Sequence, residues 1–239
     1  PATVYVDAAA SPGGDGSEST PFNTIQAALD AAADDDVIEL ADGTYTNAAD
    51  RNLDYAGKAV LIRSTNGAAN CVIDCLSSGR GFYFHTSEGP RAAVSGITIR
   101  NGRASSGGAI YVYRATPTLS NLIVEDNAAD YSGGGLYYSS GGYGDAPPVR
   151  SRVQACRITG NSADAYHGGG IYCYDSELII ETTGLNNNSA AGNGGGIYGY
   201  YNADVESRNC TIAANSAEGT GGGVYCGYNS TLSMDNGIA

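Results

Sequence analysis

The sequence predicts an all-β chain that folds as a right-handed parallel β-helix, a solenoid with a short N-terminal capping helix. Two repeated phrases and the composition point to this fold class. The first phrase is a run of glycines followed by an aliphatic residue and a tyrosine, and its five copies end at Tyr111, Tyr137, Tyr172, Tyr198 and Tyr225. The steps between these tyrosines are 26, 35, 26 and 27 residues, so the chain repeats a unit of about 26 residues.

The second phrase lies between the copies of the first and places an apolar residue three positions before an asparagine. Its four copies pair Val124 with Asn127, Ile158 with Asn161, Leu185 with Asn188, and Ile212 with Asn215. A unit of this length holds two or three short strands separated by turns, which favours about seven stacked coils. The 35 glycines and the lack of tryptophan argue against a helical bundle and agree with a turn-rich solenoid.

Local chemistry accounts for each part of the coil. The strand after each glycine run alternates apolar and tyrosine positions, so the aliphatic residue should point inward and the tyrosine outward. The expected inward stacks are Ile110, Leu136, Ile171, Ile197 and Val224 on one wall, and Val124, Ile158, Leu185 and Ile212 on another. The glycines suit a tight corner because they permit positive φ. The asparagines are expected to stack at a second corner, where Asn tolerates the left-handed conformation and amides bond from rung to rung.

The N-terminal part, residues 1–36, is predicted to contain a strand, a loop and the capping helix. Thr3 to Asp7 has strand character, and residues 23–32 place Ile25, Ala28, Leu29 and Ala32 on one helical face. Such a helix would cover the open end of the coil stack. The β-helix is assigned to residues 37–239, beginning with the strand Val37 to Leu40, with regular repeats from about residue 95. The longest step between tyrosines predicts a loop insertion at 139–148.

Charge and hydropathy limit the classes of partner. The formal net charge is −13, with a single lysine, Lys58, which argues against nucleic acid or an anionic membrane surface as partner. No apolar run approaches the length of a membrane span. Of the six cysteines, Cys156, Cys173, Cys210 and Cys226 are expected to act as inward-facing small hydrophobic residues. Cys71 and Cys75 could form a disulfide only if the residues between them turn.

The opening segments resemble secreted bacterial right-handed β-helix proteins of the pectin-lyase-like superfamily. The resemblance is carried by YVDAAASPGGDGS, PFNTIQAALDAA and VIELADGTY, followed by Asp74-Cys75 and Arg80-Gly81-Phe82. The GGGIY and IxxN phrases are similar to the GGA[ILV] and FxxN repeats of polymorphic outer-membrane protein passengers. Together these motifs cover nearly the whole chain. The resemblance implies the β-helix fold and an extracellular or cell-surface location, in a superfamily that includes lyases, hydrolases, adhesins and structural shells.

A lyase or hydrolase of this fold needs carboxylates that converge on one outer face with a nearby basic residue. Counting back seven positions from each repeat asparagine gives Ser120, Gln154, Glu181 and Arg208, and counting back nine gives Thr118, Arg152, Ile179 and Glu206. The charges alternate in sign along these columns, which favours pairing on a solvated face. His85 and His167 have no nucleophile or second histidine at motif spacing, so no catalytic residue is assigned.

No cofactor is assigned, and calcium is the one ion with candidate ligands near the N-terminal cap. The candidate ligands are Asp7, Asp15 and the run Asp34, Asp35 and Asp36. Their spacing does not match an EF-hand loop, and solvated loop carboxylates are the alternative interpretation.

The tyrosines are the strongest binding signal. One outward position repeats at Tyr111, Tyr137, Tyr172, Tyr198 and Tyr225, and a second, two residues later, repeats at Tyr113, Tyr174 and Tyr200. Tyr143 lies in the predicted insertion. The rings should form columns about 4.8 Å apart that are solvent-facing and largely unburied. They serve either to stabilise the outer sheet or as a platform for sugars or another protein.

The last coil is expected to leave an apolar rung of Val224, Cys226, Leu232 and Met234 uncovered. Either the chain continues as a longer solenoid, or this end docks head-to-tail on another copy and can propagate a filament. The sequence therefore favours a non-catalytic extracellular structural or adhesive β-helix that binds itself, other cell-surface proteins or a polysaccharide. The alternative is a polysaccharide-active lyase, hydrolase or carbohydrate-binding module of the pectin-lyase-like superfamily.

Overall fold

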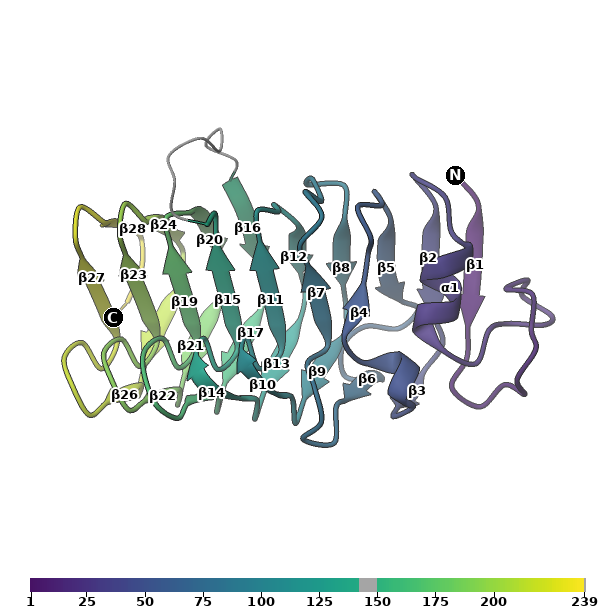
Figure 1. Cartoon of the computed structure of the whole chain (residues 1–239), viewed down its shortest axis with the longest axis horizontal. Coiled ribbons are helices and arrows are strands. Elements are labelled where there is room, and N and C mark those ends of the chain that lie inside the picture. The colour runs from purple at the N-terminus through teal and green to yellow at the C-terminus, as the bar shows by residue number, and fades with distance from the viewer. Residues whose placement is uncertain (142–149, 239) are drawn as a thin grey trace.

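The computed structural model describes residues 1–141 and 150–238, and these form a parallel β-helix whose coils stack along the long axis of the molecule (Figure 1). The N-terminus lies at one end of the stack and the C-terminus at the other. Most of the expected insertion at 139–148, including Tyr143, lies outside the described residues. Within the described residues, no helix is long and apolar enough to cross a membrane.

Four sheets form the walls, and we name them A to D. Sheet A has nine strands: β1 (Thr3–Val6), β2 (Val37–Leu40), β5 (Leu61–Ser64), β8 (Ala93–Ser95), β12 (Thr118–Ser120), β16 (Arg150–Gln154), β20 (Glu177–Glu181), β24 (Asp204–Arg208) and β28 (Thr231–Asp235). Sheet B has seven: β3 (Gly43–Tyr45), β6 (Cys71–Asp74), β9 (Thr98–Arg100), β13 (Ile123–Glu125), β17 (Arg157–Thr159), β21 (Gly184–Asn186) and β25 (Thr211–Ala213).

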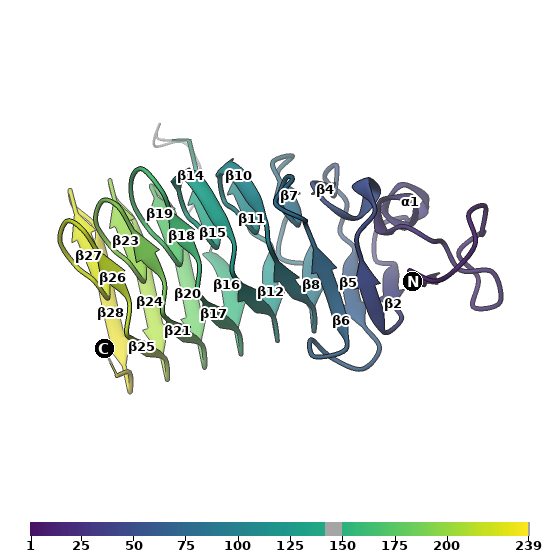
Figure 2. The same ribbon diagram turned by 90° about the horizontal axis from the view of Figure 1, so that it is seen from below.

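Sheet C has seven strands: β4 (Leu53–Asp54), β7 (Phe82–Phe84), β11 (Ile110–Tyr113), β15 (Leu136–Ser139), β19 (Ile171–Tyr174), β23 (Ile197–Tyr200) and β27 (Val224–Gly227). Sheet D has five: β10 (Arg103–Ser106), β14 (Ala128–Ser132), β18 (Ser162–Ala163), β22 (Ser189–Ala190) and β26 (Ser216–Ala217). From β2 to β7 the chain visits sheets A, B and C in turn, and from β8 onward it visits sheets A, B, D and C. Neighbouring coils lie side by side in every sheet (Figure 2).

The expected two or three strands per coil are wrong from β8 onward, where each full coil has four. The extra strand belongs to sheet D and is as short as the two residues Ser162 and Ala163. It forms where the chain leaves each repeat asparagine, and the parallel pairs Ser162 with Ser189 and Ser189 with Ser216 continue it from coil to coil. Small residues with a weak sequence signal for strand therefore pair because the neighbouring coil holds them in register.

The predicted inward stacks are confirmed. Ile110, Leu136, Ile171, Ile197 and Val224 are directly paired along sheet C, and Val124, Ile158, Leu185 and Ile212 are paired along sheet B. All are buried except Val224, which is partly buried on the last coil. Because each coil covers the apolar side chains of its neighbour, the core is one continuous column.

The glycine runs form the predicted corner between sheets D and C. Gly168 has φ +70°, where a Cβ atom would be strained. At Gly169 a Cβ atom would lie 2.2 Å from the Ser189 carbonyl oxygen and 2.6 Å from that of Gly195. The first glycine of the run thus supplies the turn, and the second permits close approach of the next coil.

The repeat asparagines stack as predicted, but their expected left-handed conformation is wrong. The residue before each asparagine takes positive φ: Asp126, Gly160, Asn187 and Ala214, at 55°, 67°, 56° and 54°. The asparagine side chains themselves form a buried ladder, in which Asn161 Nδ2 donates to Asn188 Oδ1 at 2.9 Å. Each asparagine must face inward to satisfy carbonyl groups of the coil before it, such as Val124 O at 3.0 Å from Asn161 Nδ2.

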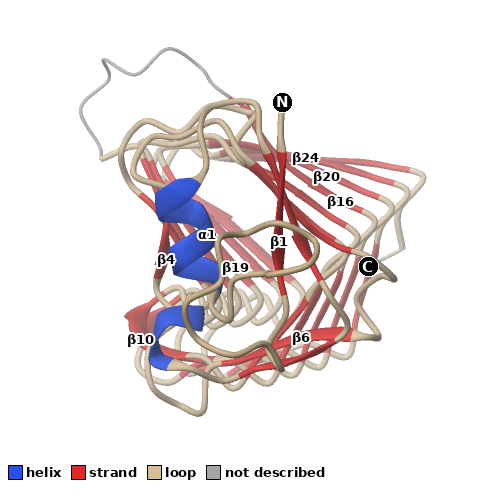
Figure 3. Ribbon diagram, turned by 90° about the vertical axis from the view of Figure 1, so that its right-hand side faces the viewer, coloured by secondary structure: helices blue, strands red, loops and turns tan. Residues whose placement is uncertain are grey.

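The capping helix forms as predicted. Helix α1 (Ile25–Ala31) lies across the N-terminal end of the stack (Figure 3) and buries Ile25 and Leu29 against the core. The adjacent 3-10 helix η1 (Ala48–Asp50) carries Asp50, whose buried carboxylate accepts a hydrogen bond from the Ile25 backbone N–H at 2.9 Å. Strand β1 pairs with β2, so the first residues extend sheet A.

The cysteines are all free, and five are buried. Cys71 begins the extended strand β6 and Cys75 follows it, so no turn brings the two together for a disulfide. The expectation that four others face inward is confirmed: Cys156, Cys173 and Cys210 are buried, and Cys226 is exposed on the last coil, whose apolar rung was expected to be uncovered. Cys226 is in register with the inward position Gly199, but it lies on β27, the outermost strand of sheet C.

Candidate functional site

The outer face of sheet C carries the predicted tyrosine column. Parallel register places Tyr111, Tyr137, Tyr172, Tyr198 and Tyr225 directly beside one another on β11, β15, β19, β23 and β27. Tyr83 on β7 extends the column by one coil. Sequence reasoning missed Tyr83 because only Gly81 precedes Phe82 there, although the order glycine, apolar residue and tyrosine is kept. We call this column, with Tyr83, the tyrosine face.

The rings of the tyrosine face stack on one another. Successive ring centroids from Tyr111 to Tyr225 are 4.8, 4.8, 5.3 and 5.1 Å apart, with interplanar angles of 4°, 6°, 14° and 6°. Each ring therefore covers the π-face of its neighbours and leaves mainly ring edges for solvent. A sugar or side chain that approaches this surface meets edges rather than open π-faces.

The expectation that these rings are largely unburied is wrong. Tyr111, Tyr137, Tyr172 and Tyr225 are partly buried, and Tyr198 is buried with 5% of its surface exposed. The His167 ring stacks on Tyr198, with centroids 4.3 Å apart at 7°. A direct hydrogen bond from the Asn193 N–H to His167 Nδ1, at 2.9 Å, holds the imidazole there.

Burial disfavours ionisation of four phenols in the column. It raises the pKa of Tyr111 and of Tyr198 to about 12, and it raises the pKa of Tyr137 and Tyr172 as well. The hydroxyl groups of these four tyrosines can donate and accept hydrogen bonds.

A guanidinium group closes the N-terminal end of the tyrosine face. Arg80 Cζ lies 5.2 Å from the centroid of the Tyr83 ring and 4.8 Å from that of Tyr111. Arg80 Nη1 is buried without a hydrogen-bond partner, and burial lowers the pKa of this side chain. The cation is stabilised by the two π-systems, whose ring planes are tilted by 57° to each other.

The second predicted column is only partly assembled. Tyr174 and Tyr200 are adjacent, with ring centroids 6.4 Å apart. Tyr113 is separated from Tyr174 by Ser139, which occupies the same register position on β15. Arg114 instead lies over the Tyr113 ring, with Cζ 5.3 Å from the centroid.

Tyr201 and Tyr228, which lie in turns, take the place of Tyr113 on this surface. The Tyr201 ring stacks on Tyr174 at 5.4 Å and on Tyr228 at 5.0 Å. Both turn residues have positive φ, 54° and 49°, and each is followed by an asparagine. Sequence reasoning missed them because they lie outside the glycine phrase, but the repeated Tyr-Asn step could have indicated them.

The charged columns on the outer face of sheet A pair as predicted. Ser120, Gln154, Glu181 and Arg208 are in register, as are Thr118, Arg152, Ile179 and Glu206. Glu181 accepts from both Arg152 and Arg208, the latter at 3.0 Å. These carboxylates are neutralised by guanidinium groups and do not form an acidic cluster.

The other candidate chemical groups have local partners. His85 Nε2 lies 3.1 Å from Asp54 Oδ2, and its ring stacks on Tyr83 with centroids 4.0 Å apart. Lys58 Nζ donates to the carbonyl oxygens of Leu29 and Asp30, at 2.6 and 2.9 Å. The single lysine thus satisfies the end of the capping helix.

The N-terminal carboxylates proposed as calcium ligands also bond locally. Asp15 accepts from the Thr20 hydroxyl and the Ser17 N–H, which lower its pKa to about 2. Asp36 accepts from the N–H groups of Ala2 and Ala33. Among the described residues, no three His, Cys, Asp or Glu side chains are grouped so that they could hold a metal ion.

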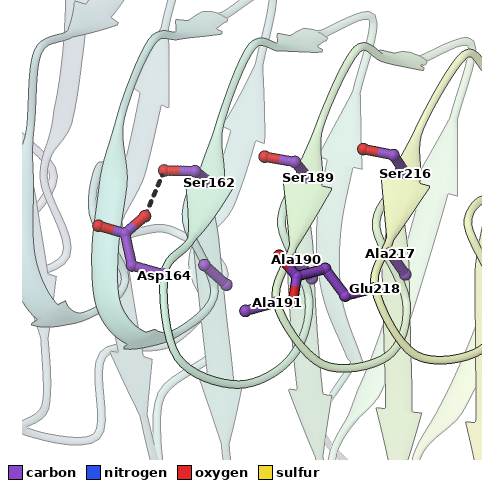
Figure 4. Close-up of a pocket in the computed structure, with 9 residues that line it drawn as sticks. Ser162, Asp164, Ser189, Ala190, Ala191, Ser216, Ala217 and Glu218 are labelled. Atoms are coloured by element: carbon purple, nitrogen blue, oxygen red, sulfur yellow. Dashed lines mark hydrogen bonds between the residues drawn. The ribbon is translucent and has the colours of Figure 1, made fainter.

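A shallow groove of about 380 Å³ runs over sheet D (Figure 4). Ser162, Ser189 and Ser216 repeat along one side of it, one coil apart, and the side chains of Asp164 and Glu218 lie on the other. Ser162 Oγ lies 2.9 Å from Asp164 Oδ1, and Arg103 pairs with the same carboxylate at 3.0 Å. The groove is open, is lined by alanines as well as by serines and carboxylates, and offers no enclosed reaction site.

Comparison with known proteins agrees with this architecture. Residues 37–238 match the family described as "Right handed beta helix region", and residues 10–53 match "Protein of unknown function (DUF1565)". No curated protein matches the chain by sequence.

Two solved structures are similar in fold. A "Rhamnogalacturonan lyase" is 13% identical over 88% of this chain and 68% of its own, with a TM-score of 0.50. The "pectate lyase Pel9A" is 14% identical over 100% of this chain and 78% of its own, with a TM-score of 0.47. At these identities the likeness concerns the fold alone. With most of its length matched by the family and its coils in parallel register, the chain belongs to the right-handed β-helix family.

Proposed function

We propose that this β-helix is a non-catalytic extracellular structural or adhesive protein that binds an extended partner along its tyrosine face. The observation that carries the proposal is the unbroken stack from Tyr111 to Tyr225, with ring centroids no more than 5.3 Å apart. A row of like groups repeated at the coil spacing suits a partner that is itself extended, such as a polysaccharide or another cell-surface protein.

The mode of binding follows from the stacking. The π-faces are already covered, so the partner would contact ring edges and neutral hydroxyl groups. The stack is also rigid, because each ring is held by its neighbours, and little side-chain entropy would be lost on binding.

A polysaccharide lyase needs a base near the sugar and a group that neutralises the uronate carboxylate. Lys58 is occupied by two backbone carbonyls, and Arg150, Arg152 and Arg208 pair with carboxylates. These contacts favour the non-catalytic proposal over the lyase or hydrolase alternative.

A binding screen tests the proposal. The full chain would be assayed against immobilised polysaccharides and cell surfaces, beside a variant with Tyr111→Phe, Tyr137→Phe and Tyr172→Phe. The variant keeps the stack and loses three hydroxyl groups, so we expect binding to weaken about tenfold or more. Tyr5→Phe, on β1 of sheet A, is the matched control. Equal binding by the variant would refute the role of the face, and release of unsaturated or reducing ends from a polymer would refute the non-catalytic assignment.

We also propose head-to-tail association through the coil ends. Strands β27 and β28 are outermost in sheets C and A, so their outer edges can pair with a further coil. Val224 and Leu232 are only partly buried there, and Met234 is 36% exposed. Light scattering over a wide concentration range should show growing assemblies, and a constant monomer mass would contradict association.

A further inference from the structure

A pair of tyrosines outside the tyrosine face has a different environment. Tyr131 lies in β14, and Tyr166 lies on the next coil between β18 and β19. The two residues are 52% and 53% exposed. The Tyr166 N–H donates to the Tyr131 carbonyl oxygen at 3.0 Å, so the two residues are direct neighbours across the coil interface.

The two rings are close enough to react with each other. Their centroids are 5.7 Å apart and their planes differ by 23°. More than half of the surface of each residue is exposed, so an oxidant can reach both phenols. Rotation of the exposed rings about their side-chain bonds would bring two ortho carbons together. Proximity held by the fold makes a reaction between them effectively unimolecular.

Other close tyrosine pairs do not combine a short ring distance with exposure of both residues. Within the tyrosine face, the rings of Tyr111, Tyr137, Tyr172 and Tyr198 are sandwiched between neighbours. Burial also raises the pKa of these four phenols, which hinders release of the proton. Tyr201 is covered by Tyr174 on one side and Tyr228 on the other. The paired exposure of Tyr131 and Tyr166 distinguishes them from these pairs.

We propose that Tyr131 and Tyr166 form an oxidative cross-linking site, where a one-electron oxidant joins the two side chains as dityrosine. Each phenol loses one electron to the oxidant and its hydroxyl proton to solvent, which leaves two phenoxyl radicals. The radicals combine in a bond between their ortho carbons, and the two displaced ring protons move to the oxygens and restore both phenols. With hydrogen peroxide and a haem peroxidase, one peroxide accepts both electrons and both protons and yields two waters.

The cross-link would join neighbouring coils covalently. The bond would close a loop between positions 131 and 166, which also contains the insertion after β15. A staple of this kind restrains the unfolded chain and resists separation of the coils. The inference is independent of the proposed binding function.

Peptide mapping tests the site. The full chain, at low concentration, would be treated with hydrogen peroxide and a haem peroxidase, digested, and analysed by mass spectrometry and dityrosine fluorescence. We expect one dominant intrachain product that links the Tyr131 peptide to the Tyr166 peptide and has lost two hydrogen atoms. This product should be absent from Tyr131→Phe and from Tyr166→Phe, and retained in Tyr228→Phe.

Two results would overturn the proposal. One is a wild-type chain in which the Tyr131–Tyr166 product does not form although free tyrosine couples under the same conditions. The other is a dominant product that maps to Tyr201 and Tyr228 or to the tyrosine face. Circular dichroism of each variant would verify the fold, which the loss of one exposed hydroxyl should not disturb.

Discussion

Replacement of Asn161 by alanine should remove the central link of the asparagine ladder. The side chain is fully buried. Its Nδ2 donates to Val124 O at 3.0 Å, Thr159 O at 3.1 Å and Asn188 Oδ1 at 2.9 Å. Its Oδ1 accepts from the backbone N–H and the side-chain amide of Asn127, at 3.1 and 2.9 Å. Alanine cannot replace any of these five bonds.

The expected loss of stability follows from these bonds. A neutral hydrogen bond contributes about 1 kcal/mol net, and a buried group left without a partner costs about 1–3 kcal/mol. The Asn127 N–H is left without its acceptor in a site closed to solvent. We therefore expect Asn161→Ala to lower the free energy of unfolding by about 3–5 kcal/mol, a large part of the usual total.

Urea unfolding followed by circular dichroism would measure this loss, and hydrogen exchange at the Asn127 amide would localise it. Asn66→Ala is the control, because Asn66 is exposed and its side-chain amide donates to Asp42. The bond that its backbone oxygen accepts from Asn70 is kept in the variant, so the effect should stay within about 0.5 kcal/mol. A loss below about 1 kcal/mol in Asn161→Ala, with unchanged protection of the Asn127 amide, would refute the reasoning.

Three further predictions concern the core, the coil contacts and pH. Tyr138→Phe removes a fully buried hydroxyl without a hydrogen-bond partner. The free energy of unfolding should therefore rise by roughly 1 kcal/mol. A lower melting temperature of the variant in thermal denaturation would contradict this. Gly195→Ala puts a Cβ atom 2.1 Å from Ser216 O and should lower the free energy of unfolding by roughly 3 kcal/mol. Gly89→Ala is the control, because its Cβ atom meets nothing within 4 Å and stability should change little. Equal melting temperatures of the two variants would refute the close contact. Because burial raises the pKa of Tyr111 and Tyr198 from 10.0 to about 12, these phenols ionise first in the unfolded state. Their contribution to stability is complete below pH 10.0 and is lost as the pH rises toward 12, and a flat unfolding profile over that range would contradict it.

The repeat made much of the fold predictable. Ile171 and its equivalents recur at one position of each coil, and in a parallel solenoid the equivalent residues of neighbouring coils must stack. The capping helix was predictable for a similar local reason, since Ile25 and Leu29 share one face. The charged columns also followed from counting, because Glu181 and Arg208 are separated by one repeat.

For the tyrosine face, counting repeats predicted the register of the rings but not their burial. The register of Tyr172 and Tyr198 was predicted, but the burial of Tyr198 was not, because it depends on His167 from a different turn. Tyr113 carries the same signal as Tyr174, and yet Ser139 interrupts its column in space.

By itself, the sequence determined the solenoid, its coil length and which residues face inward, because these follow from periodicity along the chain. Only the tertiary structure decided the fourth strand of each coil from β8 onward, the placement of positive φ before each asparagine rather than on it, and the pairing of Tyr131 with Tyr166. The physical reason is that strand pairing, side-chain burial and ring stacking depend on contacts between coils. Those contacts join residues about one repeat apart, and their geometry is set by both coils together.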